Sequence, residues 1–160
     1  MRRVPTVQCH SMEDALSWVG AIPQPHLIVI DVEPGVIGWH ASPGDRNREL
    51  VRVNALLTDA GHAVWFVSNG SFAVDVPLDV RVTTHARKPW TSIQRRPPDC
   101  AHMPCVVIGD QVWTDGLLAF RLGGILLLID LPEEGVPPWP RWQRRLSWTP
   151  RLLFSDETRA

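Results

Sequence analysis

Two aspartates follow short runs of apolar residues, at points where buried strands would end. Asp31 comes directly after the run 27–30, and Asp110 comes just beyond the run 105–108. Uninterrupted apolar runs of this length are typical of strands buried on both faces of a parallel sheet. Such sheets bind ligands at the carboxyl ends of their strands. Two carboxylates there, with few nitrogen or sulfur donors, suit a hard cation such as Mg²⁺.

A hydroxyl, a backbone amide and an ammonium group are expected at the same edge. Ser68 and Asn69 follow a further apolar run at 63–67, and Lys88 lies in the loop after a short strand expected at 80–84. The hydroxyl and the backbone N–H of Asn69 can donate to phosphate oxygens, and the ammonium group can offset their charge. A carboxylate nucleophile beside Mg²⁺ and a lysine is the arrangement that an aspartyl-phosphate intermediate needs.

Lys88 is the only lysine in the chain, because the 16 basic residues comprise this lysine and 15 arginines. A general preference for arginine explains the arginines but not the exception. An ammonium group is compact, whereas a guanidinium is bulkier and brings different hydrogen-bond geometry to a crowded phosphate site. Lys88 is therefore an exception that the general preference for arginine does not explain.

The elements that would position these groups alternate between strands and helices, which favours an α/β fold around a central parallel sheet. Helices are expected over 11–19, 45–60 and 115–122, and strands over 27–30, 63–67, 80–84, 105–108 and, as the last strand, 125–129. The intervening segment 89–104, rich in Pro and Arg, predicts at most a short helix. About 12 residues separate Glu33 from the next helix, too few for a cap domain.

Length and composition limit the class of protein. The 160 residues fit one α/β domain over 1–131, with a Pro-, Trp- and Arg-rich tail at 132–160 packed on it. An apolar content of 44% excludes a wholly disordered chain, and a net charge of −1 gives no reason to expect nucleic-acid binding. Three cysteines, no secretory signal and no apolar run long enough for a membrane span favour a cytoplasmic protein.

Four segments resemble, in order and spacing, the motifs of the haloacid-dehalogenase (HAD) superfamily of phosphatases. They resemble its short, capless branch (subfamily IIIA), which includes YqeG-type and phosphatidylglycerophosphate-phosphatase-like proteins. The resemblance spans residues 25–133 and implies a three-layer, Rossmann-like HAD fold without a large cap domain. The matching segments are Asp31–Trp39, Trp65–Asn69, Ala86–Pro89 and Gly109–Asp115.

The resemblance implies a Mg²⁺-dependent phosphomonoester hydrolase, in which Asp31 is the nucleophile and forms a phospho-aspartate. The partner it implies is a phosphorylated substrate of unknown identity. The implied catalytic residues are Asp31, Glu33, Ser68 and Lys88; the phosphate-binding residues are Ser68, Asn69 and Lys88; the metal ligands are Asp31, Glu33 (through its backbone carbonyl) and Asp110, with Asp115 in support.

The first motif departs from the family pattern at the residue that handles the proton. Glu33 stands where the family has Asp, and Pro34 and Gly35 replace Asn-Thr. One extra methylene adds about 1.5 Å of reach, and a misplacement of that order can cost about 100-fold in rate. An acyl or aryl phosphate, with a good leaving group, needs less protonation. The alternative function is a catalytically weak HAD-like protein that binds phosphate or acts as a scaffold.

Two further patterns have less specific interpretations. Cys100, His102 and Cys105 form Cys-x-His-x-x-Cys, for which a zinc site is the minor alternative to structural roles. The tail is expected to fold back over the sheet, with a membrane-surface or partner patch as the less favoured alternative. That patch would comprise Trp139, Arg141, Trp142, Arg144, Arg145 and Trp148. The sequence leaves homo-oligomerisation open.

Overall fold

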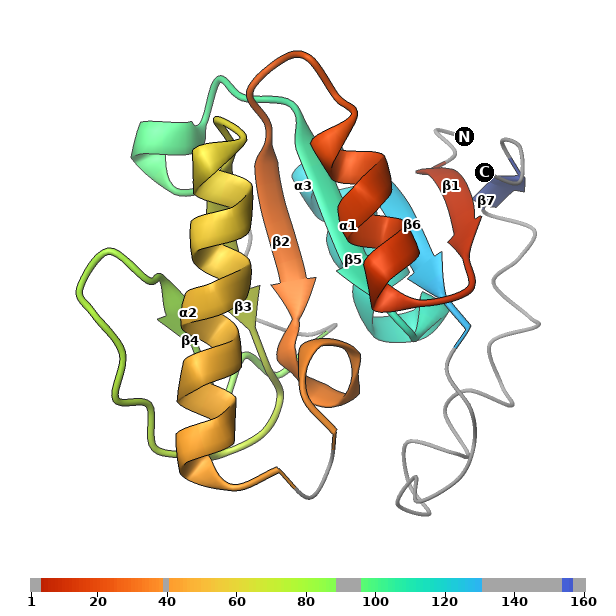
Figure 1. Ribbon diagram of the computed structural model, residues 1–160. Helices are drawn as coiled ribbons and strands as arrows, with labels where there is room; N and C mark the ends of the chain where they lie inside the picture. Colours follow the sequence, from red (N-terminus) through yellow and green to blue (C-terminus); the bar gives the residue numbers. More distant parts are fainter. Residues whose placement is uncertain (1–3, 39–40, 89–95, 131–153, 157–160) are drawn as a thin grey trace.

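A seven-stranded sheet forms the centre of the structure. The structure is a computed structural model, and it describes residues 4–38, 41–88, 96–130 and 154–156. The strand order is β4-β3-β2-β5-β6-β1-β7, and every neighbouring pair runs parallel (Figure 1). The strands are β1 (Val4–Cys9), β2 (Leu27–Asp31), β3 (Ala63–Val67), β4 (Val82–Thr83), β5 (Cys105–Gly109), β6 (Ile125–Ile129) and β7 (Phe154–Asp156).

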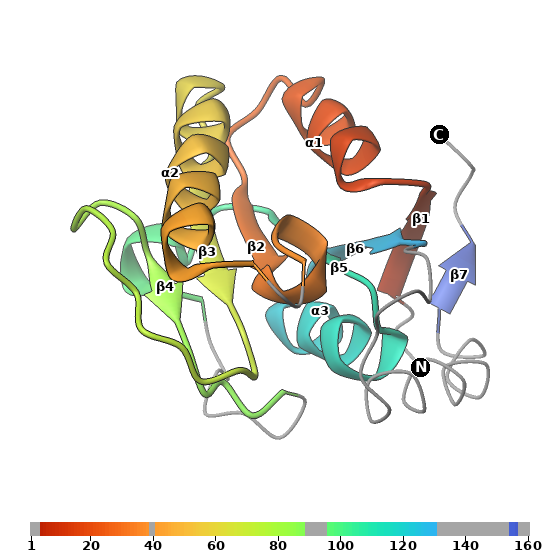
Figure 2. The ribbon, with the colours of Figure 1, turned by 60° about the horizontal axis from the view of Figure 1, so that its bottom comes forward.

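Helices cover both faces of this sheet, so the fold is an α/β sandwich of three layers. α1 (Met12–Gly20) and α2 (Pro43–Asp59) lie on one face, and α3 (Leu117–Leu122) lies on the other (Figure 2). The shorter helical turns are η1 (Val32–Val36), η2 (Pro98–Cys100) and η3 (Val112–Gly116). This confirms the expected Rossmann-like architecture without a large cap domain, because only η1 and a short connection separate β2 from α2.

The core has two parts, one on each face of the sheet. Successive residues of a strand point to opposite faces. Ile28 and Ile30 of β2 therefore pack with the apolar side chains of α1 and α2, whereas Leu27 and Val29 pack with those of α3. All four side chains are fully buried. Burial on both faces holds β2 in place, and with it the residue at its end, Asp31.

The register of the central strands brings their carboxyl ends to one edge of the sheet. Asp31 at the end of β2 is opposite Val67 of β3. On the other side, Ile30 is opposite Ile108 of β5. The residues that follow these positions emerge side by side at that edge.

Serine residues cap the two longer helices. Ser11 Oγ accepts a hydrogen bond from the backbone N–H of Asp14 at 3.1 Å, and Ser42 Oγ accepts one from Asp45 at 3.1 Å. α2 begins at Pro43, slightly earlier than expected, because proline suits the first position of a helix. The apolar side chains predicted to share a face of α2 are buried: Leu50, Val53 and Leu57.

The expectations for the sheet edges were wrong. β1 was not expected, because Pro5 and the polar Thr6 and Gln8 interrupt its apolar pattern. β6 is not the last strand, because β7 pairs with β1 beyond it. The strand expected at 80–84 is reduced to β4, which has β3 as its single neighbour. Edge strands gain less from burial, so their residues carry a weaker signal.

The 132–160 segment contributes β7 to the sheet. The tryptophans and arginines that could form a surface patch lie outside the described residues. Among the residues that are described, none of the helices is long and apolar enough to span a membrane.

Candidate active site

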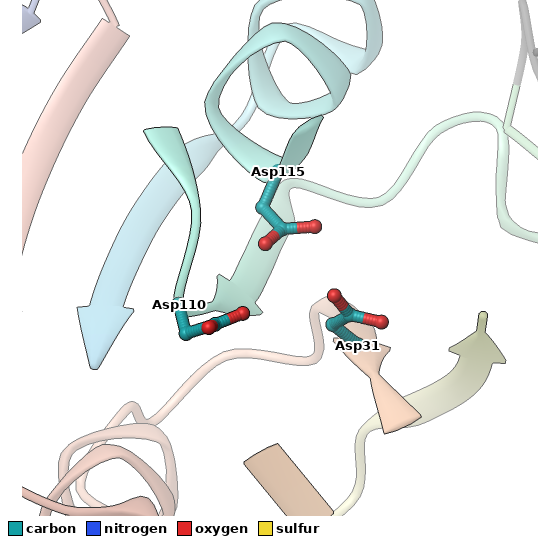
Figure 3. A group of neighbouring side chains, drawn as sticks. All are labelled: Asp31, Asp110 and Asp115. Carbon is teal, nitrogen blue, oxygen red and sulfur yellow. The ribbon is translucent and has the colours of Figure 1, made fainter. Parts of the chain in front are cut away.

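Three buried aspartates lie together at the carboxyl edge of the sheet. Asp31 ends β2, Asp110 follows β5 and Asp115 lies in η3, and their carboxylates point toward one another (Figure 3). One oxygen from each lies within 4.8 Å of the others. Within the described ranges, no other three His, Cys, Asp or Glu side chains are placed to hold an ion together. The fold therefore brings both aspartates of the predicted metal site, and the predicted supporting aspartate, into one cluster.

The ammonium group of Lys88 lies among these carboxylates. Lys88 Nζ is 2.7 Å from Asp31 Oδ2 and 2.7 Å from Asp115 Oδ1. The side chains of Lys88 and Asp115 are each 1% exposed, and that of Asp31 is 8% exposed. Charges this deeply buried are retained only where they are paired. Asp31, Asp115 and Lys88 comprise two carboxylates and one ammonium group, so these three side chains together carry a net negative charge when both carboxylates are ionised.

Burial and crowding shift the ionisation of this cluster. Burial raises the pKa of Asp31 well above its usual range; Lys88 opposes the shift, and the carboxylates of Asp115 and Asp110 add to it. Burial alone would lower the pKa of Lys88, but Asp115 and Asp31 outweigh burial and raise that pKa above its ordinary value. Lys88 is therefore charged, and the anionic form of Asp31 would be stabilised by a further cation.

The turn of η3 orients Asp115. Its Oδ2 accepts a hydrogen bond from the backbone N–H of Gln111 at 3.1 Å, and its own N–H donates to the Gln111 carbonyl at 2.9 Å. A Cβ atom at Gly109 would overlap the Asp115 carboxylate. Glycine at position 109 therefore leaves the space in which Asp115 reaches Lys88.

Asn69 holds the backbone of Lys88 from the neighbouring strand end. Its Nδ2 donates to the Lys88 carbonyl at 3.2 Å, and its Oδ1 accepts from the Lys88 N–H at 2.6 Å. The loop before Lys88 is strained, because His85 and Arg87 both have φ of 52°, which residues other than glycine rarely adopt. Such strain persists where surrounding contacts hold it in place. Asn69 thus has a positioning contact that the sequence did not reveal.

Ser68 is buried at the end of β3, beside this loop. Its Oγ accepts a hydrogen bond from the backbone N–H of Gly70 at 2.8 Å, and its carbonyl accepts one from Ala86 at 2.9 Å. A hydroxyl that accepts in this way still has its hydrogen to donate. The arrangement suits the predicted donation from Ser68 to a phosphoryl oxygen.

Glu33 lies in η1, and its side chain is outside the aspartate cluster. Its Oε1 is 3.3 Å from Nη2 of Arg46 on α2, and the Arg46 guanidinium stacks on the ring of Phe72 at 4.3 Å. On the other side, Glu33 Oε2 approaches Gly70 so closely that a Cβ atom there would be 2.6 Å away. Sequence reasoning did not identify Arg46, Phe72 or Gly70 in this role, because none of them belongs to the catalytic set implied by the motifs.

Cys100, His102 and Cys105 do not form a metal-binding group in the structure, although all three are described. Both cysteines are buried, whereas His102 is exposed. Burial raises the pKa of the Cys105 thiol to about 12, which disfavours the thiolate that binds zinc. In the structure Cys105 packs as an apolar residue at the start of β5.

Comparisons of the chain with protein-family models, with curated proteins and with solved structures gave no match. The chemistry of the site is thus the basis on which a function is proposed.

Proposed function

We propose that this protein is a Mg²⁺-dependent phosphomonoester hydrolase that works through a phospho-aspartate on Asp31, like the HAD phosphatases it resembles. The observation that carries the proposal is the ammonium group of Lys88, which is 2.7 Å from both Asp31 and Asp115. A cluster with a purely structural role is expected to balance its buried charges. Asp31 and Asp115 share the ammonium group of Lys88, and the cluster lies where parallel sheets bind ligands.

The donor set fits Mg²⁺. Asp31 and Asp110 would hold the ion with carboxylate oxygens, and the backbone carbonyl of Glu33 is the further ligand that the HAD resemblance implies. Asp115 already contacts Lys88 and the backbone of Gln111, so its proposed role is support. When bound, Mg²⁺ would polarise a phosphoryl oxygen and neutralise the excess negative charge.

In the first chemical step, a carboxylate oxygen of Asp31 attacks phosphorus. The bond between phosphorus and the substrate oxygen breaks, and its electron pair stays on that oxygen, which takes a proton from Glu33. Ser68 donates a hydrogen bond to a phosphoryl oxygen, and the ammonium group of Lys88 offsets the charge between phosphate and nucleophile.

In the second step, water attacks the phosphorus of the phospho-aspartate. The water gives a proton to Glu33, and the bond from phosphorus to Asp31 breaks with its electron pair on the carboxylate. Inorganic phosphate leaves, and the carboxylate of Asp31 and the carboxylic acid of Glu33 are regenerated.

The proposal is tested by phosphate release from 4-nitrophenyl phosphate in the presence of Mg²⁺. Asp31→Asn is expected to lose on the order of 10³-fold or more in kcat/KM, because the nucleophile is gone. Asp59→Asn, at the exposed last turn of α2, is the matched control and is expected to match wild type. Wild-type release no faster than that of Asp31→Asn would contradict the proposal.

A second candidate is a catalytically weak protein that binds phosphate or acts as a scaffold. The replacement of the usual Asp by Glu33 in the first motif favours it, because the side chain that would transfer the proton departs from the family pattern. In that case wild type would release no more phosphate than Asp31→Asn, yet calorimetry would detect phosphate binding in the presence of Mg²⁺. Phosphate binding together with turnover dependent on Asp31 would exclude this candidate.

A further inference from the structure

The carboxylate of Glu33 is held from two sides. Oε1 lies 3.3 Å from Arg46 Nη2, and Oε2 lies against Gly70, the residue whose N–H donates to Ser68 Oγ at 2.8 Å. Glu33 therefore lies next to the serine proposed to hold a phosphoryl oxygen. Both oxygens of the Glu33 carboxylate, which the extra methylene carries farther than an aspartate would reach, thus have specific neighbours.

Arg46 is itself fixed in place. It is 9% exposed, and its guanidinium stacks on Phe72 at 4.3 Å. Its Nε is buried and has no hydrogen-bond partner among the described residues. A buried guanidinium with an unsatisfied donor is costly, so losing the contact to Glu33 would cost more. Stacking on Phe72 also limits where the guanidinium can move.

Gly70 leaves the space that the longer side chain needs. A Cβ atom at position 70 would be 2.6 Å from Glu33 Oε2 and 3.1 Å from Ser68 Oγ. At 2.6 Å one of the two atoms must move, and because Glu33 Oε2 is the end of a flexible side chain, a Cβ atom at position 70 would push the Glu33 carboxylate aside. Glycine at position 70 therefore leaves the space in which the Glu33 carboxylate lies.

We propose that Arg46 is a positioning residue for Glu33. Arg46, Phe72 and Gly70 together place the carboxylate of a glutamate, rather than that of an aspartate, where it can transfer the proton. This inference rests on the proposed function. It accounts for the replacement of Asp by Glu33 in the first motif, because Arg46 contacts Oε1 of the longer side chain and Gly70 leaves space for Oε2.

The first test compares substrates by the basicity of their leaving group. Arg46→Met and Glu33→Gln should lower kcat/KM for an alkyl phosphate on the order of 100-fold, but much less for 4-nitrophenyl phosphate, because kcat/KM reports the steps up to the phospho-aspartate and this leaving group needs little protonation. KM for the alkyl phosphate should change by less than about threefold, because neither residue is proposed to bind the phosphate. The matched control is Arg52→Met, an exposed arginine of α2 that pairs with Glu49.

Two outcomes of this comparison would overturn the inference. An equal loss of kcat/KM for both leaving groups would mean that Arg46 acts on the fold, and a rise in KM alone would mean that it binds substrate directly. Arg46→Lys keeps the charge and is expected to recover part of the loss. If Arg46→Met fails to fold, Arg46→Gln supplies the same comparison, and an unchanged leaving-group dependence there would equally overturn the inference.

A double variant separates action through Glu33 from independent action. Because Arg46 is proposed to act only through Glu33, Arg46→Met/Glu33→Gln should lose no more activity than Glu33→Gln alone. Losses that multiply would overturn the inference.

The contacts around Glu33 are tested by shortening its side chain or by adding a side chain at position 70. Glu33→Asp should lower kcat on the order of 100-fold, because the carboxylate loses contact with Arg46. Gly70→Ala should lower kcat while Gly20→Ala, at a glycine with no atom near its added Cβ, should not. A kcat of Glu33→Asp equal to or above that of wild type would overturn the inference. In all of these tests Asp31→Asn must remain inactive while wild type turns over; if wild type is equally inactive, the proposed function fails and the inference fails with it.

Discussion

At Lys88, one ammonium group has two carboxylate partners at the same distance, so its shape matters as much as its charge. A guanidinium would carry the same charge, but its planar fork needs more space than a side chain that is 1% exposed has available. It would also reach Asp31 and Asp115 from different directions. The chemistry proposed for the site therefore depends on the compact cation.

Lys88→Arg is expected to keep the fold but lose most of the phosphate release, on the order of 100-fold in kcat/KM. Overpacking should lower the free energy of unfolding by about 1–3 kcal/mol. Urea unfolding and steady-state assays measure the two effects separately. The control is Arg121→Lys, at an exposed position of α3. A Lys88→Arg protein that hydrolyses phosphate as fast as wild type would show that the lysine has no special role.

The sequence indicated most of the site residues but not their contacts. Asp31, Asp110 and Lys88 follow strands, and that position alone predicted that they would converge. The contact from Glu33 to Arg46 depends instead on how α2 approaches η1, and the hold of Asn69 on Lys88 depends on two loops meeting. Such contacts arise from tertiary packing, and no local pattern in the sequence encodes them.

At the scale of elements, sequence patterns predicted the buried strands best. β3 and β6 have the predicted bounds, and β2 and β5 extend by one residue. These strands are apolar throughout because both faces are covered. α3 begins later than predicted, because the chain first forms η3, where Asp115 turns toward Lys88. The helical pattern from Asp115 onward could not distinguish this turn from the first turn of a helix.

His62 joins the end of α2 to the start of β3, at the edge of the sheet opposite the aspartates. Its Nδ1 accepts a hydrogen bond from the backbone N–H of His26 at 3.2 Å, so this nitrogen carries no proton and the ring is neutral. Burial lowers the pKa of His62 below its ordinary value of 6.5. The unfolded chain therefore binds a proton more readily than the folded protein does in this pH range.

This difference predicts that the free energy of unfolding falls as the pH drops below 6.5 toward the lower pKa of folded His62. Above pH 6.5, the stabilisation that neutral His62 contributes to the folded state is fully present. Urea unfolding between about pH 7.5 and 5.5 measures the effect. His62→Gln should flatten this part of the profile, whereas His102→Gln, at an exposed position, should leave it unchanged. A profile that is equally steep in His62→Gln would assign the pH dependence to other groups.

At the scale of the whole molecule, a net charge of −1 coexists with a group of three buried carboxylates, those of Asp31, Asp110 and Asp115, at one edge of the sheet. A cation bound there, as proposed, would offset the repulsion among these carboxylates and stabilise the folded protein. A ligand that binds only the folded state at 100 times its Kd adds about 2.7 kcal/mol.

Mg²⁺ is therefore expected to raise the melting temperature of wild type by several degrees, since about 1 kcal/mol corresponds to roughly 2–4 °C at this chain length. Chelation with EDTA should reverse the rise. Asp110→Asn should lose it, while Asp59→Asn should keep it. An equal rise in Asp110→Asn, measured by differential scanning calorimetry, would place Mg²⁺ elsewhere on the protein.

The covalent intermediate on Asp31 is the central claim, and trapping it is the most direct measurement. Protein mixed with acetyl phosphate or 4-nitrophenyl phosphate and Mg²⁺ is quenched during turnover and treated with borohydride, which reduces an acyl phosphate of aspartate to homoserine. Peptide mass spectrometry should then find homoserine at position 31 in wild type and not in Asp31→Asn. Turnover without homoserine at position 31, or with homoserine at another aspartate, would contradict the account.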